Sequence, residues 1–305
     1  MKRVFLCLCL VFCVHAVVAQ TLPPHQPLRI LIVSDEVNPH GLDDNSLTQP
    51  GDIGTALSNA SALNIGGGAN AILEIGTNQI ESATIELQRT LADSLRYDVL
   101  IYFAHRIPNN GNNAAGRQGD FVQAVESFLQ SGGAVISFHH GIYQTAGKES
   151  IQSLLGAQAT GSVPWDTMDG QTLIYVGGEH FIGTHEIAYT HQVAYEHPAH
   201  GIASDMYPAF VNVPDERYPQ MDFNNGNTDC DLSILYETDY VNNGNQHLLS
   251  YLKWCQGWGS QIFVYQPGEY QPNALEAGNN FQILLNAIYH LTGGRWDVIF
   301  KNGFD

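Results

Sequence analysis

The chain has 305 residues and a net charge of −18, because 30 Asp and Glu residues outnumber 12 Lys and Arg residues. So few cations make a phosphate-tracking surface hard to build, which argues against nucleic acid as a partner. The length suits one large domain, and no proline- or serine-rich linker, charge block or internal repeat marks a boundary.

Residues 1–19 have the pattern of a secretory signal peptide. Lys2 and Arg3 precede an apolar run from Val4 to Val18, and short aliphatic residues suit cleavage after Ala19. The run of about fifteen residues is short for a bilayer-spanning helix, and no other apolar run approaches that length. We therefore expect a secreted or periplasmic protein without a membrane span.

Beyond this leader the chain has two cysteines, Cys230 and Cys255. In an oxidising compartment two thiols suggest one disulfide, although sequence does not show that their Cβ atoms meet. A disulfide and two unpaired thiols therefore both stay open.

Buried apolar runs alternate with helical patterns along the rest of the chain. Strands are expected at 28–33, 71–75, 98–103, 134–138 and 261–265, and helices at 83–95, 120–130, 149–155 and 279–291. Between residues 172 and 240 the chain changes to strands and loops, as expected of an insertion. The alternation predicts an α/β fold with a doubly wound parallel sheet and helices on both faces.

Histidines follow several of the expected strands. His40 comes after the first, His105 after the 98–103 strand, and His139 and His140 directly after 134–138. Ligands of open α/β sheets bind beyond the carboxyl ends of the strands, so we expect these imidazoles to gather there. The alternative for His40 and His105 is an ordinary position in a solvated loop.

The turn Ser137-Phe138-His139-His140-Gly141 is the sharpest local feature. It resembles the nucleophile elbow of α/β hydrolases and class I glutamine amidotransferases, in which Ser or Cys stands two residues before the glycine. Here His139 takes that place, so this turn offers no hydroxyl or thiol to attack a carbonyl. We do not expect glutamine amidotransferase activity, and proton transfer or metal ligation by imidazole remains.

Two other stretches carry candidate polar groups. Five histidines between His180 and His200 could hold a divalent metal, but their spacing matches no zinc signature and ordinary polar surface is the alternative. Asp215 and Glu216, beside Arg217 and Tyr218, suit acid–base work or a clamp on sugar hydroxyls, and equally a solvated salt-bridge loop. Whether the protein binds a metal stays open.

Several motifs occur together in a recognisable order. They are Tyr97-Asp98-Val99-Leu100, Gly132-Gly133-Ala134-Val135 leading to His139-His140-Gly141, Leu154-Leu155-Gly156, Glu196-His197-Pro198, Asp215-Glu216 with Tyr218, and Gly257-Trp258-Gly259. In this order they resemble the ThuA-like (trehalose-utilisation) family from about Arg29 to Gly294. We assign 20–294 to this domain and 295–305 to a short tail that could be a sorting tag or a docked strand.

The resemblance implies a class I amidotransferase-like, flavodoxin-like fold and a link to sugar metabolism. We expect a secreted protein that acts on a sugar or glycoside, a small-molecule or oligosaccharide ligand. The alternative is a non-catalytic carbohydrate-binding or assembly module. The catalytic candidates are His139, His140, His197, Asp215 and Glu216, and the substrate-binding candidates are His40, His105, Tyr218, Trp258 and Glu269. Glu269 departs from the family, which tends to place Gly-His after the last strand.

Overall fold

The computed structural model describes thirteen segments of the chain and six further residues. They are 28–34, 71–76, 79–90, 92–93, 95–104, 114–143, 147–159, 172–184, 208–211, 221–223, 229–242, 245–267 and 279–293, with residues 54, 57, 58, 63, 65 and 218. Within these segments no helix is long and apolar enough to cross a membrane.

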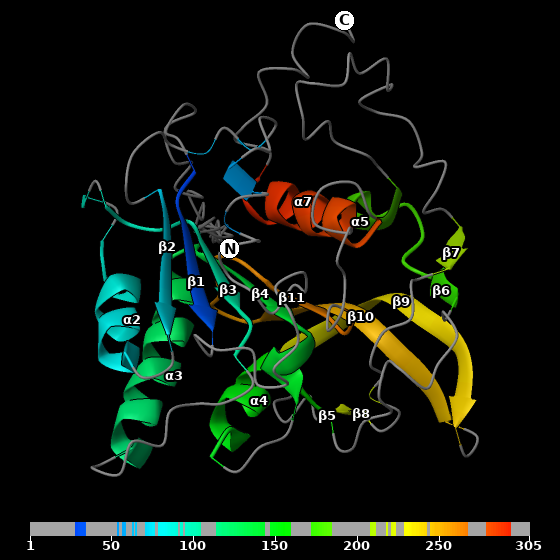
Figure 1. Cartoon of the computed structure of the whole chain (residues 1–305), viewed down its shortest axis with the longest axis horizontal. Helices are drawn as coiled ribbons and strands as arrows, with labels where there is room; N and C mark the ends of the chain where they lie inside the picture. The colour runs from blue at the N-terminus through cyan, green and yellow to red at the C-terminus, as the bar shows by residue number, and fades with distance from the viewer. Residues whose placement is uncertain are drawn as a thin grey trace, which may run out of the picture.

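A nine-stranded sheet in the order β2-β1-β3-β4-β11-β10-β9-β6-β7 forms the centre of the described structure (Figure 1). Its first five strands are parallel, and they are β2 (Ile72–Gly76), β1 (Ile30–Ser34), β3 (Val99–Tyr102), β4 (Ala134–Phe138) and β11 (Ile262–Tyr265). This is the 2-1-3-4-5 order of flavodoxin-like sheets, and it confirms the predicted fold class.

Helices cover both faces of this parallel part (Figure 1). The apolar side chains of α2 (Ile80–Leu87), α3 (Ala114–Gln130) and α4 (Glu149–Leu155) pack on one face. On the other face pack α5 (Phe181–Thr184) and α7 (Asn279–Leu291). Because both faces are covered, β1, β3, β4 and β11 are buried along their whole length, which explains their continuous apolar sequences.

Antiparallel strands extend the sheet, and β6, β7 and most of β9 come from the stretch 172–240 that was expected to hold strands and loops. The antiparallel strands are β10 (Asn245–Cys255), β9 (Cys230–Asn242), β6 (Thr172–Tyr175) and β7 (Ala209–Val211), while β5 (Ala157–Ala159) and β8 (Met221–Phe223) form a separate pair. Cys230 and Cys255 pair directly across β9 and β10, with Cα atoms 3.9 Å apart, and form a disulfide. The structure therefore has the disulfide and not the two unpaired thiols.

The helix expected at 83–95 is shifted and shortened, since α2 begins at Ile80 and ends at Leu87. Two apolar residues that supported the longer helix do not face the core: Ile85 is 60% exposed and Leu95 is 39% exposed. The stripe that does pack on the sheet consists of Ile80, Ala83 and Leu87. Apolar spacing alone therefore indicated a helix here but placed its end wrongly.

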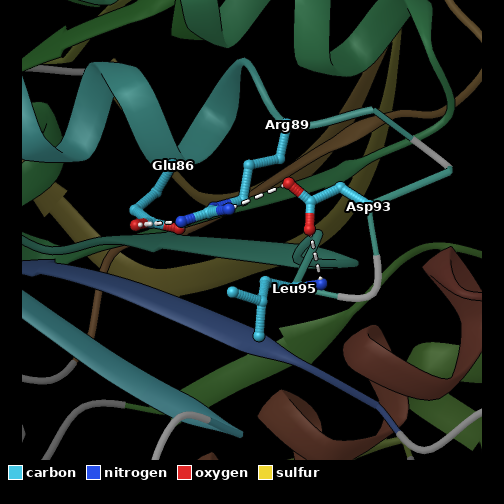
Figure 2. A network of polar contacts seen from close by, with 4 residues as sticks. All are labelled: Glu86, Arg89, Asp93 and Leu95. Atoms are coloured by element: carbon cyan, nitrogen blue, oxygen red, sulfur yellow. Dashed lines mark hydrogen bonds and ion pairs between the residues drawn. The ribbon is translucent and has the colours of Figure 1, made fainter.

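Arg89 forms ion pairs with Glu86 and Asp93 at the end of α2 (Figure 2). Arg89 donates to both carboxylate oxygens of Glu86 and, at 2.8 Å, to Asp93, whose other oxygen accepts the Leu95 N–H at 2.9 Å. The Leu95 N–H, followed by Arg89, lowers the pKa of Asp93, and the two carboxylates raise the pKa of Arg89. After α2 ends at Leu87, the Asp93 N–H bonds to the Thr90 oxygen at 2.9 Å and the Arg96 N–H to the Asp93 oxygen at 3.0 Å, on the way to β3.

Candidate functional site

The tip of β4 forms a tight, buried turn at the carboxyl end of the parallel strands. His139–Ile142 make one turn of 3-10 helix, and His139 and His140 are both buried. His139 has φ +24°, and it is the one non-glycine residue with positive φ in the described part of the chain. A bulky side chain rarely adopts this conformation, and such strain concentrates at functional sites.

The same turn requires glycine at position 141. A Cβ atom placed on Gly141 would overlap Ser137 Oγ and would lie 2.9 Å from the backbone oxygen of Tyr102. No real Cβ makes such contacts, so the strand-to-helix turn can close only with hydrogen at this place. The structure thus supports the elbow-like geometry that the sequence predicted.

A hydrogen bond to the backbone fixes the His139 ring. Its Nδ1 lies 2.7 Å from the carbonyl oxygen of Gln266. The two residues follow β4 and β11, which run side by side with Phe138 opposite Tyr265, so their strand tips meet. A carbonyl oxygen can only accept, and therefore Nδ1 carries the proton while Nε2 of the neutral ring keeps its lone pair. The arrangement suits a general base or a metal ligand.

Aromatic rings surround this imidazole. The Tyr218 ring stacks on His139 with centroids 4.4 Å apart and planes 26° apart, and Tyr143 lies 5.3 Å from Tyr218. The Gln266 side chain holds the Tyr218 backbone from both sides, accepting its N–H at 3.4 Å and donating to its oxygen at 3.3 Å. The His140 ring lies 5.0 Å from that of His139. Gln266 thus positions both His139 and the ring that covers it.

A buried lysine holds the turn by hydrogen bonds to backbone oxygens. Lys148 is fully buried, and its Nζ donates to the backbone oxygens of Ala104, at 2.9 Å, and His140, at 2.6 Å. It precedes α4, so it ties the end of β3 and the His139–His140 turn to that helix. Burying an ammonium group is costly unless its donors are satisfied, and these carbonyls supply that compensation.

Replacing Lys148 with methionine is expected to lower the free energy of unfolding by about 2–4 kcal/mol, because two buried carbonyls lose their donor. The matched control is Lys253→Met. Lys253 is also buried and also donates to two carbonyls, those of Ser153 and Leu154 at the end of α4. Chemical denaturation should show a similar loss in both variants, and only Lys148→Met should also change the environment of His139. Equal histidine NMR spectra in the two variants would remove Lys148 from the site.

The structure brings together three of the candidates from the sequence, His139, His140 and Tyr218. Six other candidates lie outside the described residues, and these are His40, His105, His197, Asp215, Glu216 and Glu269. Their contact with the turn stays a prediction.

Trp258 is not part of this group. It precedes β11 and therefore lies at the amino ends of the parallel strands, whereas His139 lies at their carboxyl ends. Its side chain is 8% exposed, packs in the core beside Lys253, and its backbone oxygen accepts the Trp254 indole N–H at 3.2 Å. Trp258 therefore lies at the opposite edge of the sheet from His139, and its expected substrate-binding role stays a prediction.

Sequence reasoning missed Gln266 and Lys148. Gln266 directly follows the strand at 261–265, so the rule that pointed to His139 would also have found it. Nothing local distinguishes Lys148, because a lysine before a helix is normally solvated. Among the described residues no group of three or more His, Cys, Asp or Glu side chains is arranged to hold a metal ion.

Comparison with known proteins gives a family match. The family model for ThuA, described as trehalose utilisation, matches residues 59–291. None of the curated proteins matches the chain.

Solved structures of similar fold include two putative ThuA-like proteins. One, from Bacteroides uniformis, is 14% identical with a TM-score of 0.52, and the match covers 89% of this chain and 94% of that one. The other, from Parabacteroides merdae, is 11% identical with a TM-score of 0.50, covering 88% and 91%. A β-galactosidase from Bacillus circulans sp. alkalophilus is 10% identical with a TM-score of 0.50, but this chain spans only 31% of it. At such identities the likeness shows the fold alone. Because the family model covers well over half of its length, the chain belongs to the ThuA family, described as trehalose utilisation.

Proposed function

We propose that this protein is an enzyme of carbohydrate utilisation that acts on a sugar or glycoside, with His139 as its proton-transferring group. The observation that carries the proposal is the 2.7 Å hydrogen bond from His139 Nδ1 to the Gln266 carbonyl. It holds the imidazole in the tautomer whose Nε2 can take a proton from a hydroxyl group. The family, described as trehalose utilisation, supports a sugar as the ligand class.

Two further features support a working imidazole over a merely structural one. The positive φ of His139 stores strain that a packing role does not need. In addition, the Gln266 carbonyl holds the ring at Nδ1 and the Tyr218 ring stacks on its face, so the imidazole is fixed before any ligand arrives. A fixed base loses little conformational entropy when the substrate binds.

The remaining catalytic candidates are assigned by chain position. Glu216 stands two residues before Tyr218, and two residues of chain span at most about 7 Å. We therefore propose that Asp215 and Glu216 hold substrate hydroxyls near His139 and that His140 and His197 assist proton transfer. The lone pair of Nε2 would also serve a divalent metal, since metal-bound histidines commonly donate their other N–H to a carbonyl. We further propose that the protein is secreted, on the basis of residues 1–19.

The test is a screen of purified protein against trehalose and a panel of other di- and oligosaccharides, with products detected by mass spectrometry and binding measured by calorimetry. We expect a new product from at least one sugar, and a repeat with a chelator shows whether a metal takes part. Saturable sugar binding without any product would support the non-catalytic alternative instead. The absence of both binding and product across the panel would contradict the proposal.

A further inference from the structure

Two histidines outside the candidate site meet where α5 packs on α7. His180 directly precedes α5, and His290 lies in the last turn of α7. Their rings are 4.4 Å apart at 62°, and both side chains are partly buried. Neither residue has a part in the proposed proton transfer.

His180 caps the start of α5 with its ring. Its Nδ1 accepts the Ile182 N–H at 3.3 Å, so the neutral ring carries its proton on Nε2, opposite to His139. The His180 backbone is held as well, because its oxygen accepts from Tyr175 OH at 3.0 Å and from Thr184 Oγ1 at 2.9 Å. The side chain thus performs the task that Asn or Asp usually performs at a helix start.

The capped turn is also the part of α5 that contacts α7. Asn286 donates its side-chain N–H to the Ile182 oxygen at 2.9 Å, and the Phe181 ring stacks on Tyr289 at 5.1 Å. Any change at the cap therefore acts on the same two residues that hold α5 in place.

We propose that this contact is an acid-sensitive joint, in which protonation of His180 breaks the cap and releases α5 from α7. A protonated ring has no lone pair at Nδ1, so it would face the Ile182 N–H with a second N–H. It would also place a positive charge against His290. In the neutral state Nε2 of His180 carries the proton and Nδ1 accepts the Ile182 N–H, so the ring has no free lone pair for a metal.

The surroundings favour the neutral ring. Burial, followed by the neighbouring His290, lowers the pKa of His180 to about 4, and burial also lowers the pKa of His290. Among the described residues, the Tyr175 hydroxyl donates to the His180 backbone oxygen and the exposed Glu179 directly precedes His180 in the chain. A folded-state pKa below the ordinary 6.5 means that the released state binds the proton first. The joint is therefore complete above about pH 7 and weakens as the pH falls from about 6.5 toward about 4.

The joint has a consequence for the site if the proposed function is right. In the sequence, His197 follows Thr184, the last residue of α5, by thirteen residues, so release of α5 would also free the chain that leads to His197. Acidification would then lower activity before the sheet unfolds.

The test compares wild type with His180→Asn between about pH 7.5 and about pH 4.5. Asparagine can accept the Ile182 N–H through its side-chain oxygen but does not titrate in this range, so it is a matched control. Hydrogen exchange of the Ile182–Thr184 amides, relative to those of α3, reports the joint without any assay of activity. We expect relative protection in wild type to fall about tenfold or more over this range, and to stay level in the variant.

A third variant, His290→Gln, should move the wild-type transition to higher pH, because it removes the neighbouring charge. Should His180→Asn fail to fold, NMR titration of the His180 ring in wild type decides the matter, since loss of α5 protection must follow that titration. Equal losses in wild type and His180→Asn, or full protection at the acidic end of the range, would overturn the proposal. If protection behaves as expected but activity does not respond to pH, the joint stands and its link to the site fails.

Discussion

A His139→Asn variant is expected to lose about 10²–10⁴-fold in turnover of the sugar found by the panel, while its fold remains intact. Asparagine tolerates positive φ better than most residues, and its side-chain N–H can replace Nδ1–H as donor to the Gln266 carbonyl. The variant therefore keeps the turn and its hydrogen bond, while it removes Nε2 together with the ring that stacks on Tyr218. Steady-state kinetics with mass-spectrometric product detection, together with circular dichroism, gives the comparison.

The control for this variant is His290→Asn, which removes an imidazole from α7 outside the candidate site. It should leave turnover at neutral pH within about twofold of wild type, an expectation that follows from its place outside the candidate site. Turnover of His139→Asn within about threefold of wild type would show that another group carries the proton.

Gly141→Ala is expected to lower the free energy of unfolding by about 3 kcal/mol or more, because overpacking against backbone cannot relax by a change of rotamer. The new methyl group would lie 2.9 Å from the Tyr102 oxygen and would overlap Ser137 Oγ, both on central strands of the sheet. Chemical denaturation measures the loss in the free energy of unfolding. The histidine NMR signals of His139 should shift as well, because the same turn holds its ring.

Gly119→Ala is the matched control for this substitution. Gly119 lies within α3, and a Cβ atom added there would meet no atom within 4 Å, so alanine should stabilise the helix by about 0.5–1 kcal/mol. Opposite signs at the two glycines would tie the effect to the turn. A loss below about 1 kcal/mol at Gly141 would mean that the turn adapts to a side chain, contrary to its role as a fixed scaffold.

The sequence allowed the central strands and two of the helices to be placed closely. β4 and the helices α4 and α7 have the predicted bounds, because each is a buried apolar pattern that ends at a glycine or a polar turn. α3 begins six residues earlier than expected, at Ala114, since its first turns lack the apolar stripe that marks the rest. α2 ends at Leu87, and the 39% exposed Leu95 does not continue its packed stripe, which apolar spacing alone does not show.

The candidate site could be predicted only where a reactive side chain comes directly after a strand in the sequence. His139 and His140 were found in this way, and the family resemblance added Tyr218. The Gln266 carbonyl lies 127 residues from His139 in sequence, and Lys148 reaches back 44 residues to Ala104, so no local spacing connects these partners. Trp258 was singled out from an aromatic motif, and spacing alone did not show that it would lie at the amino-terminal edge of the sheet, away from His139.

The protonation state of His139 is the most direct test of the account. Long-range ¹H–¹⁵N NMR of the folded protein at neutral pH should show His139 with its proton on Nδ1 and an unprotonated Nε2, as donation to the Gln266 carbonyl requires. The His139→Asn spectrum assigns the signal by its disappearance. A ring with its proton on Nε2 alone would contradict the account, because the nitrogen proposed to accept the substrate proton would then already be occupied.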